Sequence, residues 1–367
     1  MNDAALIMAP AMDEWRTAAL AYGSRDGVEL KLQPLAEACR AWRRLAVAAR
    51  GATVFHREPW LDALGRAYRL ELLIAALEAV GQQTPIAGAV LARSPLPFSH
   101  RLIALPFTDS CPPLGTEPGA ELELLRRLAA ARPLSAAYEI RGFAAPPPWR
   151  LAECFVEFRL DLDRSPAAIE SGCAAHFRRH VRHARSHGIS VCRASGIGPL
   201  RRFYKLLLAA RRRLGLPAQP LRFLSALDRE LGADLEVWIA TCRGNDIASM
   251  VLIRDRERLH YKLSARDAGG PAGAAQLLLA SAAAHYAGRF QSFELGRADV
   301  RNRGLCRFKS ELGAQCYPLP YAFLPSLPRL ISPEALTGPY AWLARLWRLL
   351  PPPLGRVLGG AIYRYLA

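Results

Sequence analysis

One stretch decides how the fold of this chain is interpreted: Glu294-Leu295-Gly296-Arg297-Ala298-Asp299-Val300-Arg301-Asn302-Arg303-Gly304-Leu305-Cys306-Arg307-Phe308-Lys309-Ser310-Glu311-Leu312-Gly313. Its apolar residues Leu305, Phe308 and Leu312 recur at helical spacing, after a short strand that is expected to end near Leu295. Lys309 lies on the same helix and can be directed away from the apolar stripe. The stretch therefore predicts a strand, a glycine-containing turn and a helix that presents a lysine.

Lysine is rare in this protein. It occurs only at positions 31, 205, 262 and 309, whereas lysine and arginine together number 49. A lysine supplies a compact charge that suits a phosphate or a developing oxyanion. We therefore regard Lys309 as a candidate catalytic residue, and an ordinary surface lysine on a C-terminal helix is the alternative interpretation.

The charge balance favours an anionic partner. The 367 residues carry a formal net charge of +17, which is typical of proteins that meet nucleic acid, coenzyme phosphates or an acidic surface. Between Ser171 and Leu227 there is no Asp or Glu, and the basic block there begins with Arg178, Arg179, Arg182 and Arg185. We predict a basic, anion-facing surface, with a merely solvated basic face as the alternative.

Cysteine and histidine patterns argue against a metal centre. The eight cysteines form no Cys-x-x-Cys pair, which argues against a zinc knuckle or a disulfide scaffold and favours a reducing cytosol. His176, His180, His183 and His187 share one helical face, but no carboxylate on that helix completes a metal site. We expect no metal. We also expect no signal peptide and no membrane span, so that the protein is soluble or peripheral.

Two parts of the chain share a coarse order of helix, strands and helix, which predicts an α/β protein of two similar domains with mixed sheets. Three consecutive prolines, Pro146 to Pro148, can continue neither a helix nor a central strand. We therefore predict an N-terminal domain over 1–148, a C-terminal domain over 149–325 and a helical tail over 326–367. The tail contains two amphipathic helices, at 340–350 and 354–366, which either dock on the protein or lie at an anionic membrane.

Periodicity predicts the individual elements. In the first half we expect helices at 58–68 and 121–131 and strands at 70–78, 85–93, 101–105 and 135–141. In the second half we expect helices at 174–187, 200–214, 221–231 and 274–287. The expected strands there lie at 154–160, 189–193, 235–242, 247–255, 258–264 and 292–295.

A glycine-rich loop precedes the helix that is expected to begin at Ala274. The unpaired N–H groups and positive dipole at a helix start favour an anion. Gly269, Gly270 and Gly273 allow the backbone to approach such an anion, and Arg266 adds a charge-assisted contact. The spacing is neither that of a P-loop nor that of the dinucleotide fingerprint, and a flexible surface loop is the alternative. Asp109, in a polar turn, is either a turn-capping side chain or a carboxylate at an inter-domain cleft.

With these residues in view, the chain resembles the FemAB-like branch of the GNAT acyltransferase superfamily, of the kind associated with exopolysaccharide and PEP-CTERM (exosortase) loci. The resemblance is carried by Phe293-Glu294-Leu295-Gly296-Arg297, by Phe308-Lys309 and Gly313, and more weakly by the segments 53–61, 105–115, 178–188, 272–273 and 349–355. Relatives commonly have Asp at the position of Glu294. The resemblance implies two tandem GNAT-like acyltransferase domains and a short amphipathic helical tail.

The resemblance also implies a function. Relatives transfer an acyl or aminoacyl group to an amine, and Phe308-Lys309 matches their aromatic–lysine pair, which serves the donor phosphate or the oxyanion. We expect an N-acyltransferase that uses acyl-CoA, either acetyl-CoA or a longer thioester. Arg266, Gly269, Gly270, Gly273, Ala274, Arg297 and Phe308 are expected to bind the donor. Lys309, Glu294 and Asp109 are expected to be catalytic, the two carboxylates as bases for the amine.

The expected acceptor is an amine-bearing saccharide or envelope precursor of exopolysaccharide or cell-envelope metabolism. The expected location is the cytoplasm, peripherally at the inner face of the cell membrane. The long basic arm of relatives that use tRNA is missing, because 210–231 offers only two short helices. An aminoacyl-tRNA-dependent aminoacyltransferase of the peptidoglycan type therefore remains the second interpretation. A non-catalytic adaptor that binds anionic lipid or nucleic acid is the third.

Overall fold

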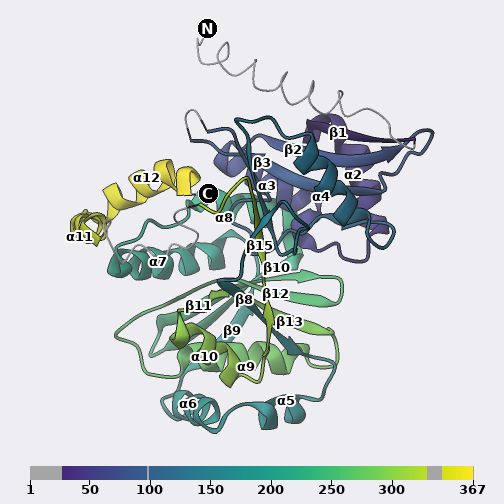
Figure 1. The fold of residues 1–367 in the computed structure, drawn as a ribbon. Helices are drawn as coiled ribbons and strands as arrows, with labels where there is room; N and C mark the ends of the chain where they lie inside the picture. The colour runs from purple at the N-terminus through teal and green to yellow at the C-terminus, as the bar shows by residue number, and fades with distance from the viewer. Residues whose placement is uncertain (1–26, 97–98, 329–340, 367) are drawn as a thin grey trace. The chain divides into compact units, whose positions relative to one another are not determined.

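The computed structural model of the protein describes residues 27–96, 99–328 and 341–366 (Figure 1), and it divides into two compact units. Unit 1 takes its described residues from 27–153 and 319–328, and unit 2 takes its residues from 154–318 and 341–366. The chain therefore leaves unit 1 after Glu153 and returns to it at Leu319.

Unit 1 is built on one mixed sheet with the strand order β1-β2-β3-β4-β6-β15-β7, and β5 pairs with β3 at the side. Its strands are β1 (Val28–Pro34), β2 (Leu72–Ala79), β3 (Ala87–Arg93), β4 (Arg101–Ile103), β5 (Leu114–Gly115), β6 (Ala137–Arg141), β7 (Arg150–Ala152) and β15 (Tyr321–Leu324). Its helices are α2 (Leu35–Ala48), α3 (Glu58–Tyr68) and α4 (Ala120–Ala130).

Helices cover both faces of the first sheet because its central strands are apolar on both sides. Leu73 and Leu91 belong to the core cluster that contains Leu124 of α4. The opposite face meets α2, where a Cβ at Gly88 would lie 2.9 Å from a methyl group of Leu45 and 3.2 Å from the ring of Trp42. Burial of such side chains stabilises the unit by about 1.5–3 kcal/mol for each large residue.

Unit 2 is built on a second mixed sheet, with the order β14-β8-β13-β12-β11-β10-β9. Its strands are β8 (Phe155–Asp161), β9 (Ser190–Ala194), β10 (Leu235–Cys242), β11 (Asn245–Asp255), β12 (Arg258–Arg266), β13 (Ser292–Asp299) and β14 (Gln315–Pro318). Its helices are α5 (Pro166–Gly172), α6 (Ala175–Ser186), α7 (Ile197–Leu214), α8 (Leu221–Leu231), α9 (Ala274–Tyr286), α10 (Arg303–Glu311), α11 (Ala341–Leu349) and α12 (Pro352–Ile362).

Two groups of helices cover the second sheet. Buried residues of α5, α6 and α9 share one core cluster with the strands, and Phe308 of α10 packs against that cluster. Helices α7 and α8 contact β10, and α7 also contacts β11 and β12. Helix α9 is apolar nearly all round and buries residues on several sides (Ala274, Leu277, Leu278, Leu279, Ala282, Ala283 and Tyr286). It is thus a core helix whose ends, rather than its sides, reach solvent.

The two sheets repeat one pairing pattern. In unit 1 the pairs β1·β2, β2·β3 and β3·β4 are antiparallel, β4·β6 is parallel, and β6·β15 and β15·β7 are antiparallel. In unit 2 the same sequence of pairs runs from β9·β10 through the parallel β12·β13 to the antiparallel β13·β8 and β8·β14. The crossover helix of each parallel pair is α4 in unit 1 and α9 in unit 2. The predicted α/β class with two similar domains is confirmed.

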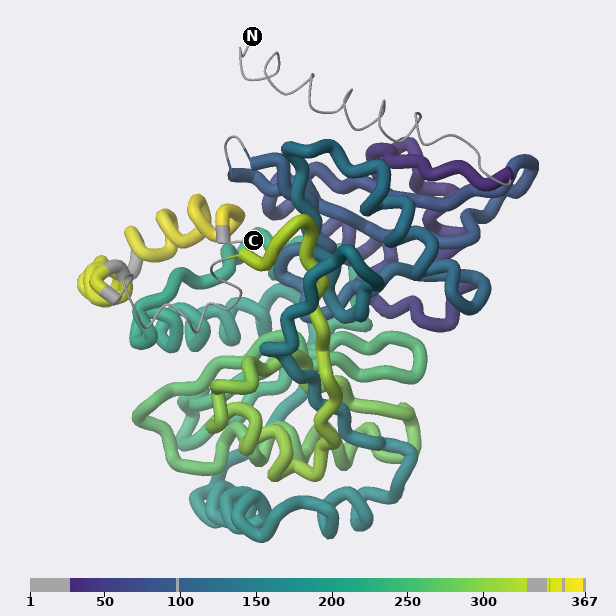
Figure 2. Tube along the Cα trace, viewed as in Figure 1, coloured from purple at the N-terminus to yellow at the C-terminus, as the bar shows by residue number. Residues whose placement is uncertain are grey.

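The predicted helix 58–68 and the predicted strand 235–242 match α3 and β10. The segments that connect the two units do not follow the predicted domain limits. The predicted limits of 148 and 325 place β7 and β15 with the C-terminal domain, whereas both strands complete the sheet of unit 1. In Figure 2 the tube can be followed from β7 out of unit 1 and back into it at β15. Four-residue strands such as β15 are fixed by their partners rather than by periodicity.

The tail joins unit 2 through α7. Helices α11 and α12 both contact α7, and the first part of the predicted tail, 329–340, lies outside the described residues. Within the described part of the chain, every helix is either too short or too polar to cross a bilayer.

Candidate functional site

The candidate site begins at a fork between two parallel strands. β12 and β13 pair only at their first three residues, from Arg258 opposite Ser292 to His260 opposite Glu294. β12 then continues to Arg266 without pairing to β13, and β13 turns to β8 through an irregularity between Glu294 and Arg297. Helix α9 starts just after β12, so the open side of the fork lies beside a helix N-terminus.

The start of α9 offers unpaired backbone donors. Its N-cap is Gly273, at φ +93°, and no side chain caps the helix. The N–H of Leu277 donates to the Gly273 carbonyl at 2.8 Å, so the N–H groups of Ala274, Ala275 and Gln276 precede the first helical hydrogen bond. Such groups, together with the positive end of the helix dipole, favour an anion.

Packing is a second reason why position 273 is a glycine. A Cβ there would lie 2.2 Å from the carbonyl oxygen of His180 and 3.2 Å from the Cβ of Ala184. Helix α6 therefore passes directly over the start of α9. Only glycine satisfies both the positive φ and this close approach.

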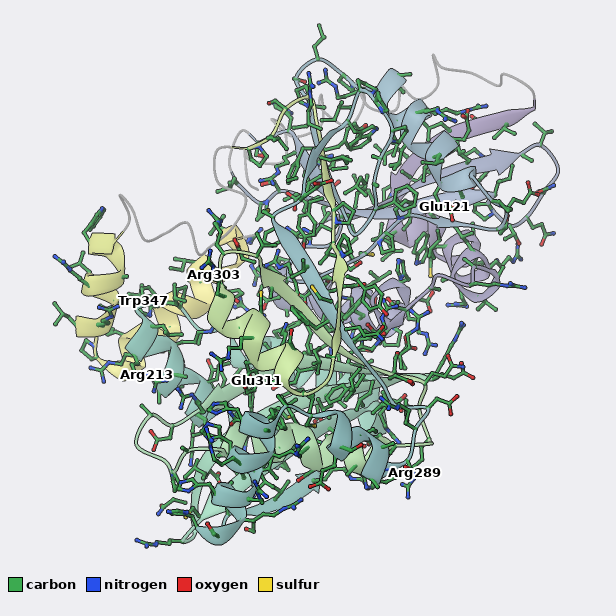
Figure 3. The ribbon with its side chains drawn as sticks, turned by 60° about the horizontal axis from the view of Figure 1, so that its bottom comes forward. Glu121, Arg213, Arg289, Arg303, Glu311 and Trp347 are labelled. Atoms are coloured by element: carbon green, nitrogen blue, oxygen red, sulfur yellow. The ribbon has the colours of Figure 1, made fainter. Side chains whose placement is uncertain are left out.

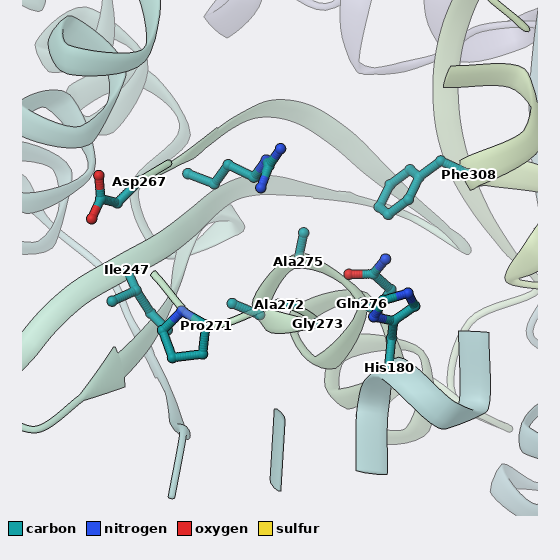
Figure 4. Close-up of a pocket in the computed structure, with 11 residues that line it drawn as sticks. His180, Ile247, Asp267, Pro271, Ala272, Gly273, Ala275, Gln276 and Phe308 are labelled. Atoms are coloured by element: carbon teal, nitrogen blue, oxygen red, sulfur yellow. The ribbon is translucent and has the colours of Figure 1, made fainter. Parts of the chain in front are cut away.

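A pocket of about 250 Å³ opens at the start of α9 (Figure 4). Its lining residues come from α6, β11, β12, the glycine loop, α9 and α10 (His180, Ile247, Arg266, Asp267, Pro271, Ala272, Gly273, Ala274, Ala275, Gln276 and Phe308). In Figure 4, Phe308, Gln276 and His180 lie at one end and Asp267 and Ile247 at the other. The pocket thus combines backbone donors, a guanidinium and an aromatic ring.

The charges around the pocket are mixed. Arg266 is exposed and supplies a permanent cation, whereas Asp267 supplies the opposing carboxylate. Burial, followed by the nearby His176 and Arg179, holds the pKa of His180 below its ordinary value. His180 is therefore mostly uncharged near neutral pH and gains a proton only in acid or beside an anion.

A second pocket, of about 400 Å³, adjoins the first and shares Ile247, Asp267 and Pro271 with it. It holds the predicted Gly269 and Gly270, together with other polar and apolar residues (His187, Cys242, Arg243 and Asn245). The glycine-rich loop therefore lies between two hollows. Four of the predicted donor-binding residues (Arg266, Gly273, Ala274 and Phe308) line the first, and the two remaining glycines line the second.

Lys309 lies behind the first pocket and does not line it. It is 4% exposed, and its amine donates to the carbonyl oxygens of Gly296 and Arg297, both at 2.8 Å. These carbonyls belong to the irregular part of β13, so the lysine holds that backbone in place. Helix α10 reaches the pocket through Phe308 instead.

Glu294 and Arg297 lie on β13 and are engaged by neighbours. The carboxylate of Glu294 accepts from Arg159 Nε at 2.9 Å and from Ser292 Oγ at 2.8 Å, and its side chain is 13% exposed. The guanidinium of Arg297 lies 4.3 Å from the ring centroid of Phe155. Neither residue lines the first pocket, although β13 forms one arm of the fork.

Asp109 lies in unit 1, in the turn after β4. Its backbone carbonyl accepts a hydrogen bond from the hydroxyl of Tyr321 at 2.6 Å. It is not among the residues that line either of the two pockets.

The predicted basic surface is divided in the structure. Arg179, Arg182 and Arg185 are exposed on α6. Arg178 is half-buried, and it donates to the carbonyls of Ser171, at 3.0 Å, and of Cys173. It therefore ties α6 to the end of α5, while the other three arginines face solvent.

Sequence reasoning assigned neither Gln276 nor Ile247 to this pocket, and it placed the histidine face that includes His180 either in a phosphate-facing groove or in solvent. Gln276 lies in the first turn of α9, which the helix start itself would have indicated. His180 and Ile247 come from α6 and β11, and only the packing of these elements brings them together. Across 27–96, 99–328 and 341–366, no three His, Cys, Asp or Glu side chains are grouped so as to hold a metal ion.

Comparisons with known proteins agree with this geometry. Residues 149–310 match the acetyltransferase (GNAT) domain family, and this part of the chain is a GNAT domain, which confirms the predicted superfamily. No curated protein sequence matches the chain.

Several solved structures share the fold at low sequence identity. FemX is 11% identical with a TM-score of 0.56, over 76% of this chain and 95% of that one. The C-terminal domain of a putative lysylphosphatidylglycerol synthetase from Agrobacterium fabrum is 13% identical with a TM-score of 0.52, over 88% and 96%. A tandem GNAT protein from the clavulanic acid biosynthesis pathway is 14% identical with a TM-score of 0.50, over 82% and 100%. These similarities establish the tandem fold.

Proposed function

From the GNAT domain at residues 149–310, we propose that the protein is an N-acyltransferase that moves an acyl group from acyl-CoA to an amine. The observation that carries this proposal is the pocket at the start of α9, where unpaired N–H groups, Arg266 and Phe308 meet. A coenzyme A thioester has a diphosphate for the helix start and a pantetheine arm whose methyl and methylene groups can pack against the ring and Ile247.

In the proposed reaction a neutral amine attacks the thioester carbonyl. The C–N bond forms, the C–S bond breaks, coenzyme A leaves as a thiolate that takes up a proton, and the amine loses a proton to a base. Glu294 is our candidate base, since it lies on the β13 arm of the fork and its carboxylate is already oriented by Arg159 and Ser292. Asp109 is a second candidate from unit 1.

We assign Lys309 a positioning role within this reaction. Its ammonium group fixes the carbonyls of Gly296 and Arg297 and so shapes the β13 arm of the fork. Phe308, its neighbour on α10, then lies against the donor. Both residues of the aromatic–lysine pair thereby serve the site, one by contact and the other through the backbone.

The proposed acceptor is an amine-bearing saccharide or envelope precursor, in exopolysaccharide or cell-envelope metabolism. The sequence signature around Glu294 and Lys309 supports this class, as does a fold shared with FemX and with a domain of a putative lysylphosphatidylglycerol synthetase. We place the enzyme in the cytoplasm, in peripheral contact with the inner face of the cell membrane.

Calorimetric titration of the full chain with acetyl-CoA, longer acyl-CoA and coenzyme A tests the donor. The informative variant is Ala275→Asp, which adds a carboxylate to the first turn of α9. This charge favours the helix by about 0.3–1 kcal/mol but repels an incoming diphosphate. We expect binding to weaken at least tenfold without loss of thermal stability, and a stoichiometry of one donor per chain in the original protein.

Ala284→Asp is the matched control, because Ala284 is an exposed alanine near the other end of the same helix. It is expected to leave donor binding unchanged while lowering stability slightly. Equal binding by the original protein and Ala275→Asp would reject the pocket as the donor site. Binding of aminoacyl-tRNA in place of any coenzyme A thioester would favour the aminoacyltransferase interpretation. Binding of nucleic acid or lipid with no donor of either kind would favour an adaptor.

A further inference from the structure

Helices α11 and α12 expose one apolar face on the side that does not pack against α7. On α11, Trp342, Leu346 and Leu349 follow helical spacing and are 57%, 54% and 77% exposed. On α12 the corresponding stripe is also exposed (Leu354, Val357, Leu358 and Ile362). These seven residues are called the tail face below. Exposed apolar side chains gathered in this way on neighbouring helices indicate an interaction site.

The opposite side of the two helices is firmly packed. A Cβ at Gly215, which ends α7, would lie 2.4 Å from the carbonyl oxygen of Ala344. Gly359 approaches Trp347 and the backbone of Ala218, and Arg222 of α8 donates to the Gly360 carbonyl at 2.9 Å. The tail is therefore docked on unit 2 through small residues, and docking does not cover the tail face.

The charged residues of α11 and α12 are all basic. Residues 341–366 contain no Asp or Glu, and Arg345, Arg348 and Arg356 are exposed among the apolar positions. Helix α7, which α11 contacts, ends in Arg211, Arg212 and Arg213. Figure 3 labels Arg213 on α7 and Trp347 on α11, on the same side of unit 2. Apolar side chains next to these arginines match an interface that is apolar below and anionic above.

We propose that the tail face binds the surface of an anionic lipid bilayer, with α11 and α12 lying in the plane of the interface. Leu, Val, Ile and Trp side chains would enter the boundary between headgroups and acyl chains, and the arginines would remain at the level of the lipid phosphates. The helices have 9 and 11 residues, which is enough to lie on a bilayer and too few to cross it. A second copy of the chain is disfavoured as the occupant, because it would bring its own arginines against these.

Co-sedimentation of the full chain with vesicles tests the proposal. Vesicles of phosphatidylcholine alone are compared with vesicles in which a third of the lipid is phosphatidylglycerol. The variant Leu349→Ser/Val357→Ser removes two exposed apolar contacts, and Arg345→Gln/Arg348→Gln removes two exposed charges. We expect the chain to bind anionic vesicles at least tenfold more tightly than neutral ones, and each variant to lose at least tenfold in affinity for the anionic vesicles.

The matched controls lie in unit 1. Val80→Ser/Leu134→Ser changes two apolar residues that are 80% and 94% exposed, and Arg40→Gln/Arg50→Gln changes two exposed arginines. Both controls should bind anionic vesicles like the original chain. Equal losses in controls and tail variants would overturn the proposal, as would equal binding to both vesicle types. A dimer in solution that the tail variants dissociate, without vesicle binding, would instead assign the face to a second copy. Calorimetry with acetyl-CoA on the same variants keeps this outcome separate from the donor proposal, because the tail face does not line the pocket.

Discussion

Units 1 and 2 place the same kind of helix start in the same topological position, and only one of them is suited to an anion. Helix α4 and helix α9 each connect the two strands of a parallel pair. Each begins at a left-handed glycine, Gly119 at φ +85° and Gly273 at φ +93°, with no side-chain cap. By backbone geometry alone, both are candidate anion sites.

The first turns of the two helices carry different charges. Glu121 and Glu123 lie in the first turn of α4, and the carboxyl group of Glu121 lies 2.7 Å from where a Cβ of Gly115 would be. The first turn of α9 has no acidic residue, and Arg266 stands beside it. The two glutamates therefore offset the positive end of the α4 dipole in unit 1. In unit 2 the first turn of α9 has no such carboxylate, so the positive end of its dipole is available to a bound anion.

The strand after each helix differs in a related way. In unit 1, β6 pairs regularly with β15 from Tyr138 to Arg141. In unit 2, β13 is irregular between Glu294 and Arg297, and Lys309 holds the carbonyls that this irregularity leaves. Bulged strands often lie next to active sites because they redirect the backbone. The two units thus share one fold, and the candidate site lies in the unit whose helix start has no acidic residue and whose next strand is irregular.

The largest expected effect is that of adding one methyl group to each glycine. Gly119→Ala meets nothing within 4 Å, so it should cost about 1–2 kcal/mol for the left-handed backbone alone. Gly273→Ala adds a clash with the His180 carbonyl at 2.2 Å, and we expect it to cost at least about 3 kcal/mol, since core overpacking adds about 1–3 kcal/mol. Urea denaturation of the two variants measures the difference. Equal costs would show that α6 does not constrain the start of α9.

A second effect concerns Lys309. Lys309→Met keeps the length of the side chain but removes the charged donor to two partly buried carbonyls, so it should lower the free energy of unfolding by about 1.5–3 kcal/mol. It should also lower kcat more than it raises the donor Kd, because the lysine does not line the pocket. Lys205→Met, at an exposed position on α7, should change neither quantity. A variant of normal stability that fails to bind donor would instead place the ammonium group on the donor itself.

The smallest expected effect is a dependence of donor binding on pH. The pKa of His180 is depressed in the folded protein, so its contribution to stability is present above the unfolded value of about 6.5 and is lost as the pH falls through the folded pKa. A bound diphosphate reverses this preference, because it favours the protonated ring. Donor affinity should therefore rise about two- to fivefold as the pH falls below 6, the size of one exposed charge contact.

His180→Gln is the control for that measurement, since it keeps polarity and cannot take up a proton. Comparison of the two proteins removes the titration of the donor phosphates, which is common to both. Parallel pH profiles for the original protein and His180→Gln would show that the ring does not sense the donor.

Much of this fold could be predicted from periodicity. Helix α3 and strand β10 have the bounds that their patterns indicate, because a continuous apolar face and clear end signals determine such elements locally. The start of α9 could be predicted as an anion site because a helix end has unpaired donors in any protein. The return of β15 to the first sheet could not, because a short strand is selected by the partner that receives it.

The candidate site was predictable to the same degree. Arg266, Gly273 and Phe308 were indicated by residue type and spacing, and the structure brings all three to one pocket. Ile247 was not assigned to it, and His180 was placed only on a helical face toward a phosphate-facing groove or solvent, since both residues reach the pocket from elements that are distant in sequence. The direction of the Lys309 side chain was also open, because a helix can place such a residue toward solvent or toward a strand.

The sequence by itself determined the α/β class, the glycines that let the chain turn into α9, and the basic character of unit 2, because these follow from local conformational preference and from charge. Tertiary structure alone decided that Lys309 faces backbone carbonyls, that His180 and Ile247 meet at the start of α9, and that the tail face remains exposed. Those outcomes depend on which surfaces meet, and the energy of a contact exists only once both partners are in place.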